Sequence, residues 1–253
     1  MQRRTLIVGN WKMHKTIAQA RELVRALLSD KSWQFPDVDV AIAPPFTALA
    51  GVAAELAGAK KPLLGAQTMH YSEQGPFTGQ ISPTMLLEVG CRYVILGHSE
   101  QREFGGETDA TVNLKVKSAL AHGMIPIVAV GESFDEHKAG RAKERVTSQI
   151  LGAFDGIDAR DRERCVLAYE PIWAIGSGLS EDPGAADDVM AEIRSIDNAF
   201  DRVQILYGGS MKPNNVESLV SQPNIDGGLI GGASLDAEVF AELIRNAHSA
   251  VAA

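Results

Sequence analysis

The spacing of apolar segments along the chain is the sequence feature that most limits how it can fold. Short runs rich in valine, isoleucine and leucine recur about every 30 residues. They occupy residues 5–10, 38–44, 63–67, 93–97, 125–131, 166–170, 204–209 and 226–232. Most of these runs lack an alternation of polar and apolar residues, which is expected of parallel strands that are covered on both faces. The sequence therefore predicts eight buried strands.

Amphipathic segments between the runs predict helices. One face of the first such helix would carry Ile17, Ala20, Val24, Leu27 and Leu28. Alternating strands and helices predict an α/β fold, a single-domain (β/α)8 TIM barrel over residues 1–253. A doubly wound open sheet would give a similar pattern, but the first turn (GNWKMHKT, residues 9–16) lacks the GxGxxG motif of dinucleotide-binding sheets.

Composition excludes several classes of partner. The chain has 24 basic and 32 acidic residues, a net charge of −8, so it has no overall attraction to nucleic acid or anionic lipid. No segment approaches the roughly 20 apolar residues of a membrane span, and the run after Arg4 is too short for a signal peptide. Cys91 and Cys165 lack the spacing of a disulfide framework or a zinc site, so we expect both to be buried. These observations favour a cytoplasmic protein.

The residues that end each apolar run are the informative ones, because sites in such barrels form at the carboxyl ends of the strands. Those that bear on chemistry are Asn10, Lys12, His98, Glu100, Glu170, Ser210, Gly231 and Gly232. Taken singly, each has an ordinary explanation, such as a solvated lysine or a tight glycine turn. Together they place a cation, an imidazole, a carboxylate and two glycine-rich turns on one rim. This combination indicates a catalytic site.

The residue types at this rim indicate the reaction class. Backbone N–H groups in the glycine turns after the seventh and eighth strands can approach a phosphate closely, and Gly176 could add another. No HExxH motif, paired acidic residues or Cys/His set provides a metal site. A single base beside a polarising group fits proton abstraction next to a carbonyl, without metal or cofactor. A Schiff base on Lys12 is an alternative that the residues leave open.

Four blocks of sequence resemble the triosephosphate isomerase family, and the resemblance covers essentially the whole chain. The blocks are GNWKMHKT (9–16), YVILGHSEQRE (93–103), AYEPIWAIGSG (168–178), and YGGS (207–210) with IGGASL (230–235). The resemblance implies a cofactor-independent isomerase of glycolysis and gluconeogenesis that interconverts dihydroxyacetone phosphate and D-glyceraldehyde 3-phosphate.

The resemblance also implies a role for each matching residue. Glu170 would shuttle a proton between two substrate carbons, and His98, as a neutral imidazole, would polarise the substrate oxygens through an enediolate; both roles are the family's established mechanism. Lys12 would stabilise developing negative charge with the help of Asn10, and Glu100 matches the family's second acid. The family's phosphate-binding positions fall at Gly176, Ser210, Gly231 and Gly232.

The resemblance also implies roles for two longer segments. The segment from Pro171 to about Ser180 matches the family's lid, which closes over the substrate and excludes water. The long loop around Phe77, Thr78 and Gly79 matches the loop that family dimers insert beside the partner's site. A homodimer is therefore expected.

The chain departs from the family pattern at the lid and at the expected dimer contact. Leu179-Ser180-Glu181 replaces the usual Lys-Thr-Ala, so we expect the motion of the lid's C-terminal hinge, rather than the chemistry, to differ from the family's. Gln80 and Gln101 stand where the family commonly has Glu and Arg, so an ion pair would become a hydrogen bond between amides.

Two alternatives remain at this stage. The first is an isomerase of a four-carbon ketose phosphate on the same scaffold, which would need room for one more carbon. The second is a catalytically silent barrel kept for binding. The presence of Lys12, His98 and Glu170 together weighs against the second.

Overall fold

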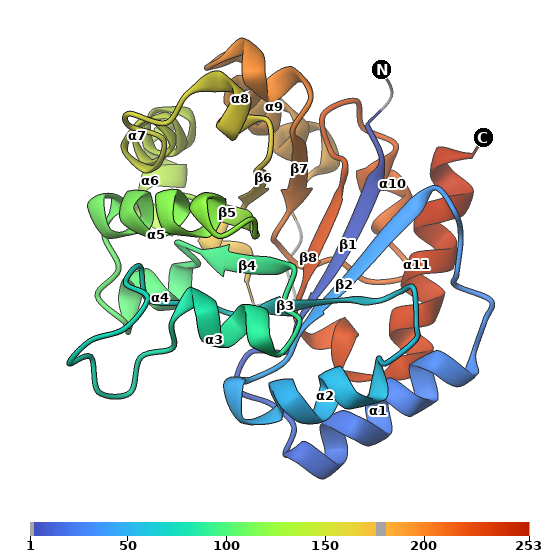
Figure 1. Ribbon diagram of the computed structural model, residues 1–253. Coiled ribbons are helices and arrows are strands. Elements are labelled where there is room, and N and C mark those ends of the chain that lie inside the picture. The colour runs from blue at the N-terminus through green and yellow to red at the C-terminus, as the bar shows by residue number, and fades with distance from the viewer. Residues whose placement is uncertain (1–2, 176–180, 253) are drawn as a thin grey trace.

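The computed structural model describes residues 3–175 and 181–252. Eight parallel strands pair in sequence order, and the eighth pairs with the first to close a barrel (Figure 1). The strands are β1 (Thr5–Asn10), β2 (Val38–Ala43), β3 (Leu63–Ala66), β4 (Tyr93–Leu96), β5 (Ile125–Val130), β6 (Val166–Tyr169), β7 (Gln204–Tyr207) and β8 (Gly227–Ile230). The (β/α)8 prediction is confirmed. All but β1 end one or two residues earlier than predicted, so Glu170 follows β6 rather than ending it.

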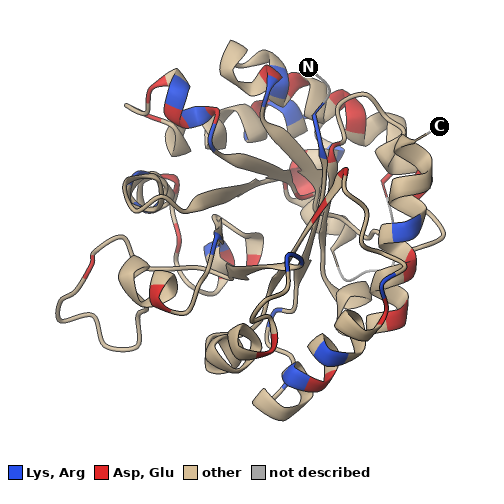
Figure 2. Ribbon diagram, turned by 45° about the vertical axis from the view of Figure 1, so that its right-hand side comes forward, with Lys and Arg blue, Asp and Glu red and all other residues tan. Residues whose placement is uncertain are grey.

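Helices surround the barrel and cover its outer face (Figure 1). They are α1 (Ile17–Ser29), α2 (Leu49–Glu55), α3 (Pro83–Glu88), α4 (Ser99–Glu103), α5 (Asp109–Ala121), α6 (Phe134–Lys138), α7 (Ala142–Ala153), α8 (Ala159–Arg162), α9 (Pro183–Ser195), α10 (Val216–Val220) and α11 (Ala237–Val251). Short 3₁₀ turns are η1 (Phe46–Ala48), η2 (Ile172–Ala174), η3 (Asn198–Asp201) and η4 (Gly232–Leu235). Charged residues lie mainly on these helices and the loops (Figure 2).

The first helix shows why these segments are helical and where the pattern misled. Thr16 caps α1 in a capping box with Gln19, which satisfies donors at the helix start. The buried face carries Ala20, Leu23, Val24 and Leu27. Ile17, which the pattern placed on the same face, begins the helix and is 51% exposed.

Two apolar layers hold the fold together. Small and branched side chains such as Val8, Ala41, Ala129 and Ala168 fill the inside of the barrel, and a larger cluster lies between the strands and the helices. The predicted burial of Cys91 and Cys165 is confirmed, and burial raises the pKa of both thiols to about 12. In the described part of the chain, no helix is long and apolar enough to cross a membrane.

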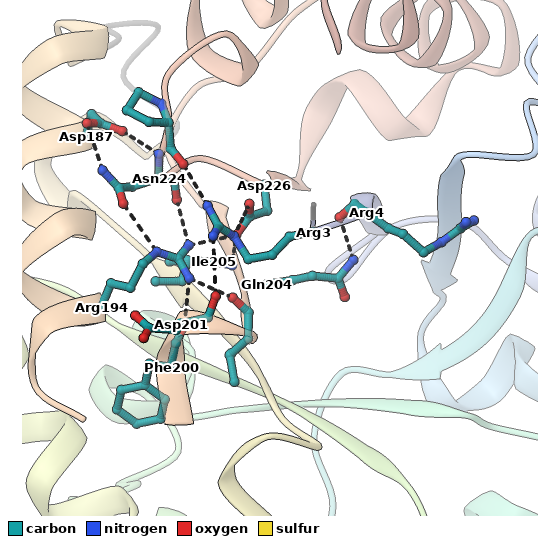
Figure 3. A network of polar contacts seen from close by, with 12 residues as sticks. Arg3, Arg4, Asp187, Arg194, Phe200, Asp201, Gln204, Ile205, Asn224 and Asp226 are labelled. Carbon is teal, nitrogen blue, oxygen red and sulfur yellow. Dashed lines mark hydrogen bonds and ion pairs between the residues drawn. The ribbon is translucent and has the colours of Figure 1, made fainter. Parts of the chain in front are cut away.

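A network of polar contacts ties the start of the chain to β7, β8 and α9 (Figure 3). Asp226 is shared by three donors: Arg3 Nε at 2.7 Å, Arg194 Nη2 at 2.8 Å and the backbone N–H of Ile205 at 2.9 Å. Burial lowers the pKa of Arg194, and the adjacent carboxylate opposes this effect. The network therefore anchors the amino ends of the strands, opposite the end where the candidate site lies.

Candidate active site

The carboxyl ends of the strands bring the predicted residues together. A pocket of about 390 Å³ is lined by Asn10, Lys12, His98, Glu170, Ile175, Gly208, Gly209, Ser210, Met211, Lys212, Leu229, Gly231, Gly232 and Ala233. Glu100 is not among them but contacts both Lys12 and His98. Gly176, Leu179 and Ser180 lie outside the described residues. Across residues 3–175 and 181–252, no group of three or more histidine, cysteine or acidic side chains is arranged to hold a metal ion.

Glu170 is a buried carboxylate of which only one oxygen accepts a hydrogen bond from the described residues. Its backbone N–H donates to Val130 O at 2.8 Å, which continues the β5–β6 pairing by one bond, and its side chain is 2% exposed. Oε2 accepts the N–H of Ser99 at 2.9 Å. Oε1 lies 3.1 Å from His98 Nε2, but out of line for a hydrogen bond, and has no hydrogen-bond partner among the described residues. A buried, unsatisfied carboxylate oxygen costs stability, so its presence at a pocket wall indicates function.

Neighbouring glycines make room for this carboxylate. A Cβ at Gly131 would lie 1.8 Å from Glu170 O, and one at Gly208 would lie 2.8 Å from Glu170 Cγ. Either contact is far shorter than van der Waals distance, so only glycine fits beside Glu170 on these two sides. The flanking strand ends β5 and β7 thus set the position of the residue that follows β6.

His98 is fixed in one neutral tautomer by the start of α4. Its Nδ1 accepts the backbone N–H of Glu100 at 3.2 Å, so Nδ1 carries no proton. The proton of the neutral ring then lies on Nε2, which faces Glu170 Oε1. The side chain is buried, which protects this arrangement from water. His98 can therefore donate a hydrogen bond to an oxygen in the pocket.

The turn that carries His98 is anchored by groups that sequence reasoning missed. Gly97, with φ +74°, donates its N–H to the buried Glu107 at 2.8 Å, and Lys115 Nζ pairs with the other oxygen of Glu107. Arg102 Nε donates to Gly97 O at 2.7 Å, and its Nη1 donates to Asp109 at 2.6 Å. The sequence signal was present, since Gly97 ends an apolar run and charged residues follow closely.

Lys12 is placed by an unusual backbone conformation. Its φ of 51° is left-handed, which costs energy for a residue with a Cβ and is characteristic of functional sites. Its N–H donates to Asn10 Oδ1 at 3.1 Å, and its carbonyl accepts from Gln67 Nε2 at 2.8 Å. The ammonium lies 2.7 Å from Glu100 Oε1 and stays a quarter exposed. It therefore presents a positive charge at the pocket wall.

Two glycine turns, after β7 and β8, form another side of the pocket. Asn215 holds the turn after β7 by donating to Ser210 O at 2.9 Å, and Ser234 holds the turn after β8 by donating to Gly231 O at 2.7 Å. η4 begins at Gly232, and the first N–H groups of a helical turn have no partner within it. Lys212, which the sequence reasoning did not single out, adds a second cation. This side is suited to an anion such as a phosphate.

One pocket combines a base, a neutral hydrogen-bond donor and two glycine turns suited to an anion. Glu170 can accept a proton, and His98 and Lys12 can stabilise negative charge on a neighbouring oxygen. Comparison with known proteins agrees with this geometry: residues 5–247 match the sequence profile of the family described as triosephosphate isomerase. The chain belongs to the triosephosphate isomerase family.

Curated relatives resemble the chain along nearly its full length. The triosephosphate isomerase of Chloroflexus aurantiacus is 48% identical, over 95% of this chain and 98% of its own. The triosephosphate isomerase of Herpetosiphon aurantiacus is 47% identical over 96% of this chain and 99% of its own, and that of Carboxydothermus hydrogenoformans is 44% identical over 96% and 98%. The match to the triosephosphate isomerase family runs from β1 into α11 and so includes every strand end described above.

Proposed function

We propose that this chain interconverts dihydroxyacetone phosphate and D-glyceraldehyde 3-phosphate through an enediolate. The observation that carries the proposal is the approach of Glu170 Oε1 to His98 Nε2, 3.1 Å apart at the wall of a pocket that is also lined by glycine turns suited to an anion. A base and a neutral donor at that distance can both reach the adjacent C1 and C2 of one triose. Membership of the family supports the same reaction.

Glu170 carries the proton that leaves one substrate carbon and returns to the other. Glu170 removes a proton from C1 of dihydroxyacetone phosphate while His98 Nε2–H donates a hydrogen bond to the carbonyl oxygen on C2. The electrons of the broken C–H bond form the enediolate. Glu170 then returns the proton to C2, a proton moves between the two oxygens, and an aldehyde remains at C1. No redox partner is consumed, because one substrate carbon is oxidised as the other is reduced.

Lys12 and Asn10 support the charge that develops in this step. The Lys12 ammonium reaches the pocket from the end of β1, and Asn10 fixes the left-handed backbone that aims it there. Glu100 pairs with the ammonium and supplies the N–H that sets the tautomer of His98. We assign Glu100 to the site through these two contacts.

The phosphate end is assigned to the glycine turns. Ser210, Gly231 and Gly232 line the pocket and have backbone N–H groups suited to a dianion, and Gly176 is proposed as a further donor on the resemblance alone. The segment from Pro171 to about Ser180 is proposed as the lid on the same ground. Closing it would remove water from the enediolate and strengthen its contacts with His98 and Lys12.

A homodimer and a cytoplasmic location complete the proposal. Met13, next to Lys12, is 94% exposed, and the loop between β3 and α3 projects away from the barrel with Phe77 partly exposed (Figure 1). Covering these apolar side chains with a second copy would remove them from water. The substrate, a phosphorylated intermediate of glycolysis and gluconeogenesis, and two free cysteines are in keeping with the cytoplasm.

A coupled assay on two substrate sizes tests the proposal. The wild-type protein should turn over triose phosphate rapidly and a four-carbon ketose phosphate poorly, judged by kcat/KM. Glu170→Ala should lose activity by about 10²–10⁴-fold, the range for loss of a positioned base. Glu163→Gln, an exposed acid far from the pocket, is the matched control. A preference for the four-carbon substrate would favour the alternative isomerase, and a wild-type protein inert on both would favour a binding barrel.

A further inference from the structure

Two buried carboxyl groups contact one tyrosine, Tyr169, which immediately precedes Glu170 in the chain. Tyr169 Oη lies 3.2 Å from Glu132 Oε1 and 3.1 Å from Glu181 Oε2. Tyr169 and Glu132 are 0% exposed, and Glu181 is 6% exposed. Glu132 follows Gly131 at the end of β5, and Glu181 is the first described residue after the segment proposed as the lid. The mechanism above uses none of these three side chains.

The number of protons available for hydrogen bonding restricts the charge of Tyr169, Glu132 and Glu181. A phenol has one proton, so Tyr169 can donate to only one of the two carboxyl oxygens. The other contact is a hydrogen bond only if that carboxyl group is protonated and donates to the phenol oxygen. Two ionised carboxylates around one buried hydroxyl would instead repel each other at low dielectric. Two full hydrogen bonds at this hydroxyl therefore call for one proton shared over the two carboxyl groups.

The groups that face the trio do not remove this requirement. Trp173 Nε1 donates to Glu132 Oε1 at 2.8 Å, and the half-exposed His137 of α6 lies 3.7 Å from the same oxygen. The other oxygen of Glu132, Oε2, is buried without a hydrogen-bond partner in residues 3–175 and 181–252. On the β7 side, Tyr207 Oη accepts the backbone N–H of Glu181 at 3.2 Å.

The described neighbour of Glu181 along the chain adds negative charge. Asp182 follows it directly and is negative, and it raises the pKa of Glu181 further. On the Glu132 side, Gln149 of α7 is occupied by the backbone N–H of Gly131 at 2.8 Å. His137 is thus the one basic side chain that the described structure places within 4 Å of a carboxyl oxygen of the pair.

We propose that Glu132 and Glu181 share one proton through Tyr169, and that this proton positions the end of β6 that carries Glu170. The three are positioning residues, because they act on the catalytic base through the backbone. Tyr169 immediately precedes Glu170, and Trp173 lies three residues after it, so the trio holds the chain on both sides of the base. The role in catalysis rests on the proposed function; the shared proton does not.

The shared proton has a direct consequence for stability. Burial and the charge of Glu132 raise the pKa of Glu181 to about 7, and burial raises the pKa of Glu132. A carboxyl group with a raised pKa binds its proton more tightly in the folded protein than in the unfolded chain. The resulting stabilisation is complete below the ordinary pKa of 4.5 and is lost as the pH rises through about 7.

The test compares the wild type with Glu181→Gln and Glu132→Gln, each of which imitates a permanently protonated carboxyl group. Urea unfolding from pH 4.5 to 9 should show the folding constant of the wild type falling, relative to either variant, by up to about 10-fold per pH unit until about pH 7. The double variant should show no further change. Glu192→Gln on the outer face of α9 is the matched control, and its curve should parallel the wild type.

Infrared spectroscopy tests for the shared proton, and kinetics test whether that proton helps to position Glu170. The wild type should keep a protonated-carboxyl band at pH 6 that disappears in both single variants. The pH profile of kcat should lose an alkaline limb near pH 7 in Glu181→Gln, while KM changes less than kcat. Parallel stability curves together with no such band would overturn the shared proton. A band and altered curves with an unchanged kcat profile would overturn the positioning role. An inactive wild type with the band present would instead count against the proposed function.

Discussion

Glu170 and His98 face each other across one wall of the pocket, with Oε1 of the carboxylate 3.1 Å from Nε2 of the imidazole. The two residues follow β6 and β4, which are separated by β5 in the barrel. Ser99 joins them, because its N–H belongs to the turn that fixes His98 and donates to Glu170 Oε2. The proposed base and the proposed electrophile are therefore held by one short segment, and a disturbance of either is expected to reach the other.

The tautomer of His98 can be measured directly. Because Nδ1 accepts the N–H of Glu100, nitrogen-15 spectra at neutral pH should show one histidine with its proton on Nε2 and an unprotonated Nδ1. His98→Gln identifies the signal by removing it. A His98 signal with protons on both nitrogens would contradict the assignment.

The charge of Lys12 should matter more than its backbone strain. Lys12→Met removes the ammonium from the pocket, so kcat/KM should fall by about 10²–10³-fold, as for loss of one preorganised electrostatic contact. Lys15 is the matched control, since it also has a left-handed backbone (φ 75°) but does not line the pocket. Steady-state kinetics of both methionine variants decide the point; equal losses would mean that the position of the Lys12 charge in the pocket is not what matters.

Asp226 should be among the costliest acidic residues to neutralise for stability. Asp226→Asn leaves the guanidinium groups of Arg3 and Arg194 without their shared carboxylate, and breaking a buried ion pair costs about 3–5 kcal/mol. Asp201→Asn is a suitable comparison, because Arg3 contacts only the backbone oxygen of Asp201. Chemical denaturation should show a large loss for the first variant and a small one for the second; similar losses would contradict a central role for Asp226.

The proposed dimer should depend on Met13. Placing a charge there with Met13→Asp would oppose burial of this exposed apolar site, so sedimentation should show the variant dissociating at higher protein concentration than the wild type. Lys143→Asp on α7, away from the projecting loop, controls for a general effect of the new charge. A variant that dimerises as tightly as the wild type would place the contact elsewhere.

Dimer dissociation should vary little with ionic strength. Gln80 and Gln101 are uncharged where the family commonly has an acid and a base, so the contact proposed between copies lacks that ion pair. Restoring the charges with Gln80→Glu and Gln101→Arg together should introduce a salt dependence. A steep loss of wild-type dimer between low and high salt would refute this expectation.

The eight strands and their order could be predicted from sequence, because strands that are covered on both faces consist of continuous apolar runs, which distinguishes them from loops. The rim residues could be found by the rule that strand ends carry the site, and Lys12, His98 and Glu170 do line one pocket. The same rule applied to the end of the fifth run would have found Glu132. The exposure of Ile17 and the exact ends of the strands could not be predicted, since they depend on how each helix approaches the sheet.

Sequence by itself determined the class of fold and the chemical groups at the rim, because burial periodicity and residue type are local properties. Only the tertiary structure decided which atoms meet. The tautomer of His98 depends on the N–H of Glu100, and the space for Glu170 depends on glycines from two other strands. The contact of Glu132 and Glu181 with one tyrosine joins residues 49 positions apart in the chain. The strength of such interactions depends on the distance between the groups and on their burial, and both are set only when the barrel has folded.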